Sequence, residues 1–173
     1  MTTNSIKEKI VGDKTQATAA KYLTFILAGE SYGIPVLKVR EIIKQVPVTA
    51  IAQLPPYIKG VLNLRGRIIP VLDMRIKFNM EVSKDTNHTC IIVVQVLSVS
   101  RKTILLGLVV DAVEEVSSIV ASDIEDTPDF GTTLDTSYLV GMAKIKGKVV
   151  SLLNIDHCLG AADLEAVERT AEA

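Results

Sequence analysis

The sequence predicts an all-β protein built from two similar small barrels. Three observations lead to this prediction. Val and Ile together supply 39 of the 173 residues, against 17 Leu, and β-branched side chains suit pleated strands better than helices. Short apolar runs alternate with turns that contain Gly and Pro. The second part of the chain also repeats the pattern of the first, which is typical of a duplicated unit.

Strands follow one another along most of the chain. The clearest are expected at residues 22–27, 32–36, 68–72, 91–97, 103–116 and 148–154. Pro35 would remove a ladder hydrogen bond from a central strand, so the strand that contains it is expected at a sheet edge or a bulge. The run 103–116 is expected to be one long strand, and a bend within it is left open. Asp73 follows the strand at 68–72 and is placed to cap a short turn over 74–76.

These elements predict one folded region between two tails. Residues 1–20 are polar and aperiodic and are expected to be a flexible tail. The folded region covers 21–162, with a first barrel mainly from 21–80 and a second mainly from 88–160, and exchange of strands between them is left open. Residues 163–173 are expected to form a helical tail, because their D-L-E-A-V-E-R start favours a helix. Short helices are thus expected at the ends of the all-β fold.

Length and charge narrow the class of protein. A chain of 173 residues that is 48% apolar buries a core without disulfides. The net charge of -1 gives no reason to expect nucleic acid or anionic lipid as a partner. No apolar run is long enough for a signal peptide or a membrane span, and two cysteines cannot build a disulfide framework. We therefore expect a cytoplasmic protein with no direct membrane insertion.

The internal repeat appears when the chain is shifted along itself. At a shift of 81, residues 57–74 align with 138–155 without a gap, and Gly60 and Gly66 fall on glycines. At a shift of 74, residues 33–42 align with 107–116, again with a glycine in register. Each copy is too small for a sandwich and closes most economically as a barrel, because closure removes exposed edges. Two such barrels leave a groove between them.

The densest local pattern is the segment from Tyr57 to Met74. Within it, N-L-R-G-R at 63–67 predicts a hairpin turn in which Gly66 takes a positive φ. Arg65 is then expected at the tip of the hairpin, aimed outward, where a guanidinium can recognise acidic or polar groups on a partner. The plainer alternative is a solvated turn residue.

Several strings resemble the CheW family of chemotaxis coupling proteins. The most specific are I-K-G-V-L-N-L-R-G-R-I-I-P-V-L-D-M-R at 58–75 and Y-G-I-P-V-L-K-V-R-E-I at 32–42. Three later strings are similar to the family as well, L-G-L-V-V-D at 106–111, P-D-F at 128–130 and Y-L-V-G at 138–141. The resemblance covers about residues 20–162.

This resemblance implies both a fold and a role. The fold is two intertwined five-stranded SH3-like barrels. The role is that of an adaptor with no catalytic activity, no cofactor and no metal. It joins the CheW-like regulatory domain of a CheA-type histidine autokinase to the cytoplasmic tip of methyl-accepting chemoreceptors. Such a protein is cytoplasmic and is recruited to membrane receptor arrays.

The resemblance also assigns roles to individual residues. Expected to face the receptor are Val39, Glu41, Lys59, Gly60 and Arg65. Expected to serve the kinase contact are Phe130, Gly107 and Gly141. Plainer alternatives stay open from the residues alone. Val39 is then a core residue, the glycines are turn residues, and Phe130 packs within its own loop.

Other functions find less support in the sequence. The two histidines, His88 and His157, each lie near a cysteine, Cys90 or Cys158, but this spacing is not typical of a zinc or Cys/His catalytic site. A small-barrel nucleic-acid-binding protein needs aromatic faces and a basic track, which seven Phe and Tyr residues, no Trp and a net charge of -1 do not provide. A CheW-like adaptor of a non-flagellar pathway, controlling surface motility or another output, is a further alternative.

Overall fold

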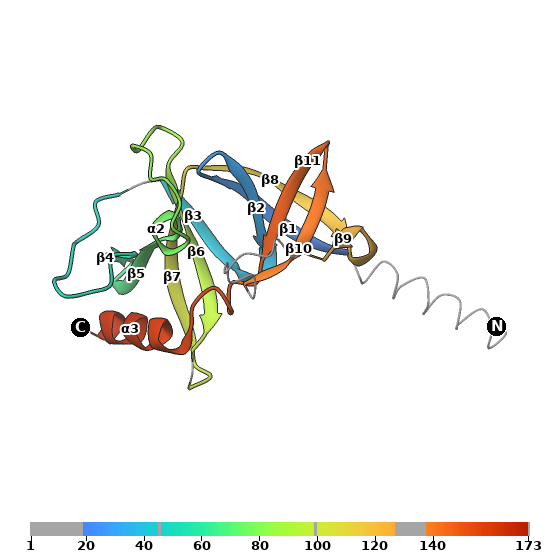
Figure 1. Ribbon diagram of the computed structural model, residues 1–173. Coiled ribbons are helices and arrows are strands. Elements are labelled where there is room, and N and C mark those ends of the chain that lie inside the picture. The colour runs from blue at the N-terminus through green and yellow to red at the C-terminus, as the bar shows by residue number, and fades with distance from the viewer. Residues whose placement is uncertain (1–18, 45, 99, 127–137, 173) are drawn as a thin grey trace.

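The computed structural model describes residues 19–44, 46–98, 100–126 and 138–172. The described chain forms two β-sheets that lie side by side, one of six strands and one of five (Figure 1). The longest helix of the described chain, α3 (Ala161–Glu172), lies beside the five-stranded sheet. The all-β fold class predicted from the sequence is confirmed.

The six-stranded sheet contains β1 (Ala19–Leu27), β2 (Glu30–Pro35), β8 (Ala112–Val120), β9 (Ile124–Glu125), β10 (Leu139–Ile145) and β11 (Lys148–Leu153). The five-stranded sheet contains β3 (Val39–Lys44), β4 (Ile58–Leu64), β5 (Arg67–Asp73), β6 (Cys90–Leu97) and β7 (Thr103–Val110). The helical elements are η1 (Val36–Lys38), α2 (Met74–Lys77), η2 (Ala121–Asp123) and α3 (Ala161–Glu172).

The two sheets share one strand order. The five-stranded sheet runs β3-β6-β7-β5-β4, and the six-stranded sheet runs β8-β1-β2-β11-β10-β9. In each sheet the third and fourth strands are parallel, and the other neighbours are antiparallel. The sixth strand, β9, has only two residues, and a single bridge from Thr49 to Val61 stands in its place in the other sheet. The duplication therefore extends from the sequence to the topology.

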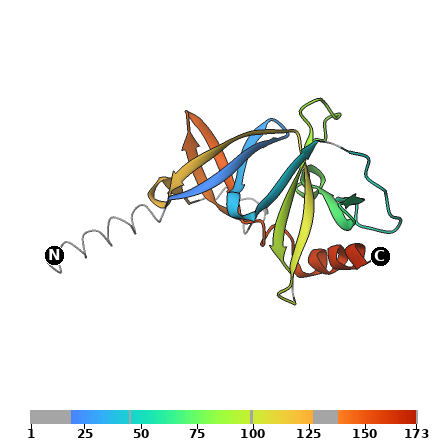
Figure 2. The same ribbon diagram turned by 180° about the vertical axis from the view of Figure 1, so that it is seen from behind.

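Hairpins are exchanged between the two halves of the chain. The first-half hairpin β1–β2 lies in the sheet of β8, β10 and β11, and the second-half hairpin β6–β7 lies in the sheet of β3, β4 and β5. Each sheet therefore takes strands from both sides of residues 80–88. Figure 2 shows β3 and β8 leaving the junction between the sheets toward opposite halves of the molecule.

Two local expectations are corrected. The run 103–116 is not one strand, because β7 ends at Val110 and β8 begins at Ala112 in the other sheet. Asp111 lies at this crossing, and its N–H donates to the carbonyl of Ile26 at 3.0 Å. The strand that contains Pro35 is also not at an edge, because β2 lies between β1 and β11. Pro35 is its last residue, and a missing N–H is tolerated where a strand ends.

Each sheet closes around a small apolar cluster of its own. In the five-stranded sheet, Leu62 of β4 and Ile43 of β3 belong to one cluster although these strands lie at opposite edges. In the six-stranded sheet, one cluster brings Ile119 of the edge strand β8 together with Ala143 of β10 and Ile124 of β9, the opposite edge. Contact between opposite edges means that each sheet curls into a barrel.

A third and larger cluster joins the two barrels. It includes Phe25 and Ile34 from the six-stranded sheet and Leu72, Ile92 and Leu106 from the five-stranded one, each at most 1% exposed. Because this shared core is apolar and close-packed, it fixes one barrel against the other. The chain thus has three cores, one within each barrel and one between them.

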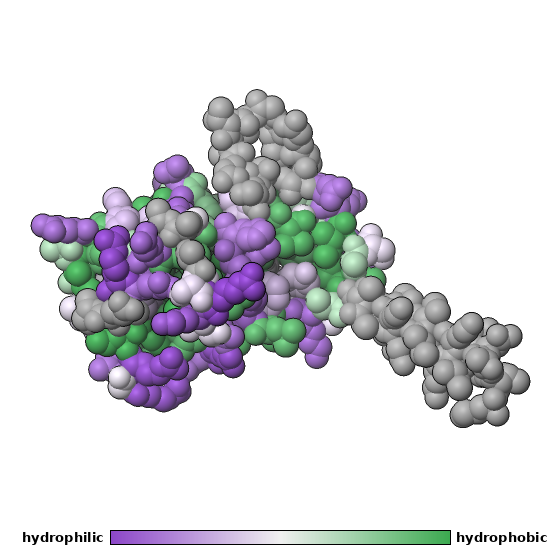
Figure 3. All heavy atoms as spheres, turned by 90° about the horizontal axis from the view of Figure 1, so that it is seen from below, coloured by the Kyte–Doolittle hydropathy of each residue, from purple (hydrophilic) through white to green (hydrophobic). Residues whose placement is uncertain are grey.

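Exposed apolar side chains occur in equivalent pairs. Ile42 corresponds to Val116 at the shift of 74, and Ile68 corresponds to Val149 at the shift of 81. All four are between 42% and 58% exposed. On the face seen in Figure 3, apolar patches lie between polar ones over both halves of the molecule. Each barrel therefore presents apolar side chains to solvent at similar places.

Candidate functional site

Arg65 lies at the tip of a tight hairpin. Arg65 and Gly66 form the two-residue connection between β4 and β5, and their φ angles are +52° and +81°. Positive φ at both positions is the pattern of a type I′ turn, whose twist matches that of the flanking strands. Asn63 Oδ1 accepts a hydrogen bond from the N–H of Gly66 at 2.9 Å. The hairpin predicted from N-L-R-G-R is therefore confirmed.

The guanidinium of Arg65 forms a double hydrogen bond with a neighbouring strand. Nη1 and Nη2 donate to the two carboxylate oxygens of Glu41 on β3, both at 2.8 Å. The Arg65 side chain is 73% exposed and that of Glu41 is 24% exposed. These hydrogen bonds raise the pKa of Arg65 above its ordinary value, so the guanidinium stays charged. The pair holds a flat, polar surface in a fixed orientation at the edge of the barrel.

A pocket of about 410 Å³ opens beside this ion pair. Its floor contains Leu64, Ile69, Val93 and Leu105, which belong to the core of the five-stranded barrel or pack against it. Glu41 and Arg65 form part of its rim. An apolar floor with a charged rim suits a partner segment that brings apolar and polar side chains together.

The other residues expected to face the receptor, Val39, Lys59 and Gly60, do not line this pocket. Val39 is partly buried and packs against the core between the barrels. A bulge in β3 separates Val39 from Glu41. Lys59 and Gly60 precede the hairpin on β4. A Cβ at Gly60 would lie 2.0 Å from the carbonyl oxygen of Thr49, so no side chain fits there. The structure thus brings Glu41 and Arg65 into contact and gives Val39 and Gly60 packing roles.

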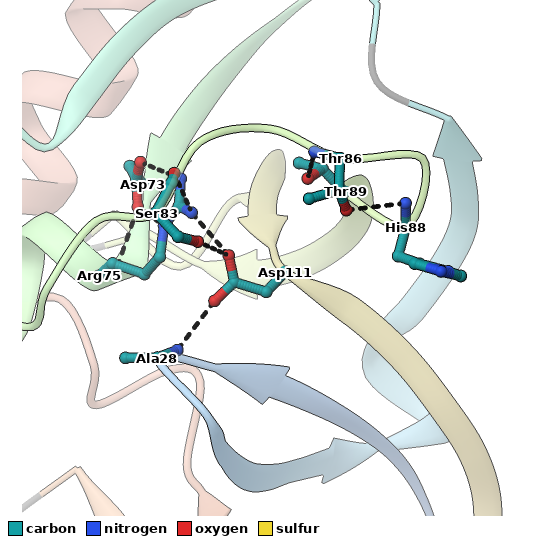
Figure 4. A network of polar contacts seen from close by, with 8 residues as sticks. All are labelled: Ala28, Asp73, Arg75, Ser83, Thr86, His88, Thr89 and Asp111. Carbon is teal, nitrogen blue, oxygen red and sulfur yellow. Dashed lines mark hydrogen bonds and ion pairs between the residues drawn. The ribbon is translucent and has the colours of Figure 1, made fainter.

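A buried ionic network links the two barrels. Arg75 donates to both oxygens of Asp73, and its Nη1 lies 2.7 Å from Asp111 Oδ1 (Figure 4). The side chains of Arg75 and Asp73 are each 1% exposed. Asp111 Oδ2 also accepts the N–H of Ala28, in the β1–β2 turn of the other sheet, at 2.8 Å. As predicted, the Asp73 side chain caps α2 by accepting from the N–H of Arg75.

Sequence reasoning missed this network. Its signal is a pair of charged residues at 73 and 75, directly after an apolar strand, and a lone aspartate at 111 inside a long apolar run. A charge inside such a run is buried only with a partner, so the three positions could have been matched.

The C-terminal helix is tied to the barrel by a polar cluster. Tyr57 donates a hydrogen bond to Asp163 at the start of α3, and Lys77 Nζ lies 2.6 Å from the other oxygen of that carboxylate. Lys77 also lies 4.7 Å from the centre of the Tyr57 ring. Burial alone would raise the pKa of Asp163, but hydrogen bonds from Lys77 and Tyr57 outweigh it and hold that pKa below its ordinary value.

Comparison with known proteins identifies the family. The model of the CheW-like domain matches residues 21–163. Chemotaxis protein CheW of Klebsiella aerogenes is 39% identical over 91% of this chain and 92% of its own length. Chemotaxis protein CheW of Rhizobium meliloti is 31% identical over 86% of this chain and 97% of its own. The chain belongs to the CheW family. Its function is therefore that of a scaffold or adaptor protein in chemotaxis.

A solved CheW structure has the same fold. The scaffolding protein TtCheW from Thermoanaerobacter tengcongensis superposes with a TM-score of 0.72 at 35% identity, covering 82% of this chain and 88% of that one. The two curled sheets are thus the SH3-like barrels of CheW. Because proteins of this family are scaffolds, their functional residues are those that form binding surfaces.

The residues expected at the kinase contact do not form one patch. Gly107 lies on β7 of the five-stranded sheet, whereas Gly141 lies on β10 of the six-stranded sheet, and both are buried. A Cβ at Gly107 would lie 2.8 Å from Ile91, and one at Gly141 would lie 2.6 Å from the carbonyl oxygen of Glu125. Phe130 lies outside the described residues. The structure therefore gives the two glycines a packing role, and their role toward a kinase stays a prediction.

The cysteines and histidines stay apart from the candidate site. Cys90 and Cys158 are both buried, and both are free thiols. Burial raises the pKa of Cys158 to about 12. Within the described ranges, no group of three or more His, Cys, Asp and Glu side chains is placed to hold a metal ion. No helix in the same part of the chain is long and apolar enough to cross a membrane.

Proposed function

We propose that this CheW-family protein couples transmembrane chemoreceptors to a CheA-type histidine autokinase by binding both at once. One surface contains Arg65, Glu41 and the apolar pocket beside them and receives the cytoplasmic tip of a receptor. A second surface binds the regulatory domain of the kinase. The protein itself performs no chemistry, and it is held at membrane receptor arrays through its receptor contact.

The observation that carries the receptor contact is the bidentate pair of Arg65 and Glu41. Its two 2.8 Å hydrogen bonds hold the exposed guanidinium over an apolar pocket. A receptor tip is an antiparallel helical hairpin. The apolar face of one helix can cover Leu64 and Leu105, while its polar side chains meet the charged rim. Such a contact is small, and an affinity on the order of micromolar is expected for it.

The kinase contact is proposed for the remaining surfaces of the barrels. A kinase regulatory domain of the CheW-like kind brings barrels of the same shape. The paired apolar positions, such as Ile68 with Val149 and Ile42 with Val116, support packing between similar surfaces. Phe130, with Gly107 and Gly141 maintaining the barrels, is proposed to serve this contact. Holding two weak partners on one rigid body raises the concentration of kinase near receptors.

The test replaces Arg65 by Glu and compares the variant with a matched control. Lys146→Glu makes a similar charge reversal at the equivalent turn of the other barrel. Each variant is used to capture a purified receptor cytoplasmic fragment and, separately, the kinase. We expect Arg65→Glu to lose the receptor while its circular dichroism and kinase binding stay unchanged, and Lys146→Glu to keep the receptor. Unchanged receptor capture by Arg65→Glu would contradict the proposed site.

A further inference from the structure

The duplicated barrels provide an internal comparison for the pocket beside Arg65. At the shift of 74, Arg40 and Glu41 correspond to Glu114 and Glu115. At the shift of 81, Arg65 and Arg67 correspond to Lys146 and Lys148. Both copies therefore hold four charged side chains on the same two elements, an outer strand and a hairpin.

In the six-stranded barrel these four charges neutralise one another. Lys146 Nζ lies 2.8 Å from Glu115, and Lys148 Nζ lies 3.3 Å from Glu114. The hydroxyl of Ser31 also donates to Glu114 at 2.7 Å. Two lysines therefore meet two glutamates, and this copy leaves no excess charge for a partner.

In the five-stranded barrel, one of the four positions differs, and the positive and negative charges are not equal in number. Arg40 stands where the other copy has its second glutamate, so three arginines and the single Glu41 line this pocket. Arg65 takes both oxygens of that carboxylate. In the described part of the chain, neither Arg40 nor Arg67 forms an ion pair. Both side chains are exposed, and both line the pocket with the apolar floor.

Three arginines against the single Glu41 leave this pocket with two positive charges that no side chain of the described residues pairs. A ligand that carries two negative charges neutralises them and gains charge-assisted hydrogen bonds. The floor of Leu64, Ile69, Val93 and Leu105 adds a second requirement, because a phosphate or a bare anion would leave these side chains uncovered. A protein segment with carboxylates flanking apolar side chains meets both requirements.

We propose that Arg40 and Arg67 form a carboxylate-recognition pair that selects an acidic, apolar-faced protein segment for the pocket beside Arg65. The inference rests on the proposed function only in assigning this segment to the receptor. It adds two residues to the site and predicts the charge of the partner. The equivalent place on the six-stranded barrel, closed by its own lysine–glutamate pairs, does not bind such a segment.

The experiment measures binding of two probes by fluorescence anisotropy at low and moderate salt. The first probe is a synthetic helical peptide with Leu on one face and Glu on both sides of it, together with a matched peptide in which every Glu is Lys. The second probe is a receptor cytoplasmic fragment. The variants are Arg40→Glu and Arg67→Glu, and the control is Lys148→Glu, which makes a similar charge reversal at the position equivalent to Arg67. Circular dichroism and melting temperature verify that each variant is folded.

We expect the Glu peptide to bind the wild type, more weakly as salt rises, and roughly tenfold more weakly to either arginine variant. Lys148→Glu should bind within about twofold of the wild type, and the Lys peptide should not bind the wild type. In Arg40→Glu, the new carboxylate takes the place equivalent to Glu114 and should form an ion pair with Arg67. That pair would neutralise the charge that the peptide binds.

Three results would overturn the inference. Both arginine variants could bind the Glu peptide as the wild type does, or Lys148→Glu could weaken it equally, which means a general charge effect. A labelled single-stranded oligonucleotide could also bind tightly with the same dependence on Arg40 and Arg67, which would assign the site to nucleic acid. Failure of the proposed function looks different, because the wild type would then bind the Glu peptide but not the receptor fragment.

Discussion

Lys146 stands in the second half of the chain where Arg65 stands in the first. Each is the first residue of a two-residue turn, with φ of +50° and +52°, and each is followed by a glycine with φ near +80°. Each also reaches a glutamate on the outer strand of its own barrel at 2.8 Å. The two barrels therefore repeat one backbone and one ion pair, and they differ in the charges around it.

In each barrel, a glycine on the first strand of the hairpin lies close to a backbone carbonyl of a neighbouring segment. Adding a single methyl group at either glycine is therefore expected to lower stability strongly. Gly60 has φ of +147° and faces the carbonyl oxygen of Thr49, while Gly141 has φ of +159° and faces that of Glu125. We expect Gly60→Ala and Gly141→Ala to destabilise the protein by roughly 2–4 kcal/mol in urea unfolding, from backbone strain plus the clash.

The matched control for these variants is Gly66→Ala. Gly66 also has a positive φ, but a Cβ there meets nothing within 4 Å. The cost should be only about 1–2 kcal/mol, from the left-handed conformation alone. Equal effects at Gly60 and Gly66 would contradict the packing role. If Gly60→Ala is destabilised as expected and also loses receptor binding, the loss of binding follows from the damage to the fold.

The buried network between the barrels predicts that removing one of its charged side chains lowers stability far more than removing an exposed charge nearby. Arg75→Ala leaves the buried Asp73 without its partner and removes a partner of Asp111. We expect a loss of about 3–5 kcal/mol of unfolding free energy. Lys84→Ala, an exposed change in the nearby loop, should stay within about 0.5 kcal/mol. A small effect of Arg75→Ala would mean that the network does not hold the barrels together.

The cluster around Asp163 predicts how the attachment of α3 depends on pH. Because the folded pKa of Asp163 lies below its ordinary value of 3.8, its contribution is present above that value and is lost as pH falls through the folded pKa. At neutral pH, Asp163→Asn should cost about 1–2 kcal/mol. The difference between variant and wild type should shrink toward pH 3, measured by unfolding and by amide exchange in α3. A difference that does not change with pH would contradict this account.

Burial of the cysteines predicts slow reaction with thiol reagents. Because burial raises the pKa of Cys158 to about 12, very little of this thiol is ionised at pH 8, and the thiolate is the reactive form. Burial also raises the pKa of Cys90. Native protein should therefore react with a disulfide reagent far more slowly than protein unfolded in guanidinium chloride, where both thiols react. Rapid labelling of the native protein would show that a cysteine is open to solvent.

Much of the fold could be predicted because the local signals agree with one another. The β-branched composition, the glycines repeated at shifts of 81 and 74, and the Asp73 cap all describe local backbone that the structure confirms. The turn at Arg65 was predicted for the same reason, because an Arg-Gly pair between apolar strands allows few conformations.

Strand partners could not be predicted in the same way. Two similar halves offer similar edges, so β3 can pair with a strand of its own half or with β6 of the other. Pairing with either preserves the alternation of apolar and polar faces, and the sequence does not distinguish them. The chain crosses from one sheet to the other at Asp111, which there pairs with a buried arginine 36 positions earlier in the chain. The family resemblance placed Arg65 and Glu41 on one surface, but their ion pair could not be predicted from spacing, because the two residues are 24 positions apart.

The central claim is that one chain holds receptor and kinase at the same time. The most direct measurement sediments lipid vesicles that display a receptor cytoplasmic fragment, in the presence of purified kinase, with and without this protein. We expect the kinase to sediment with the vesicles only when the wild-type protein is added, and not when Arg65→Glu is added. Kinase that remains in the supernatant with the wild type, or that displaces the protein from the vesicles, would contradict the claim.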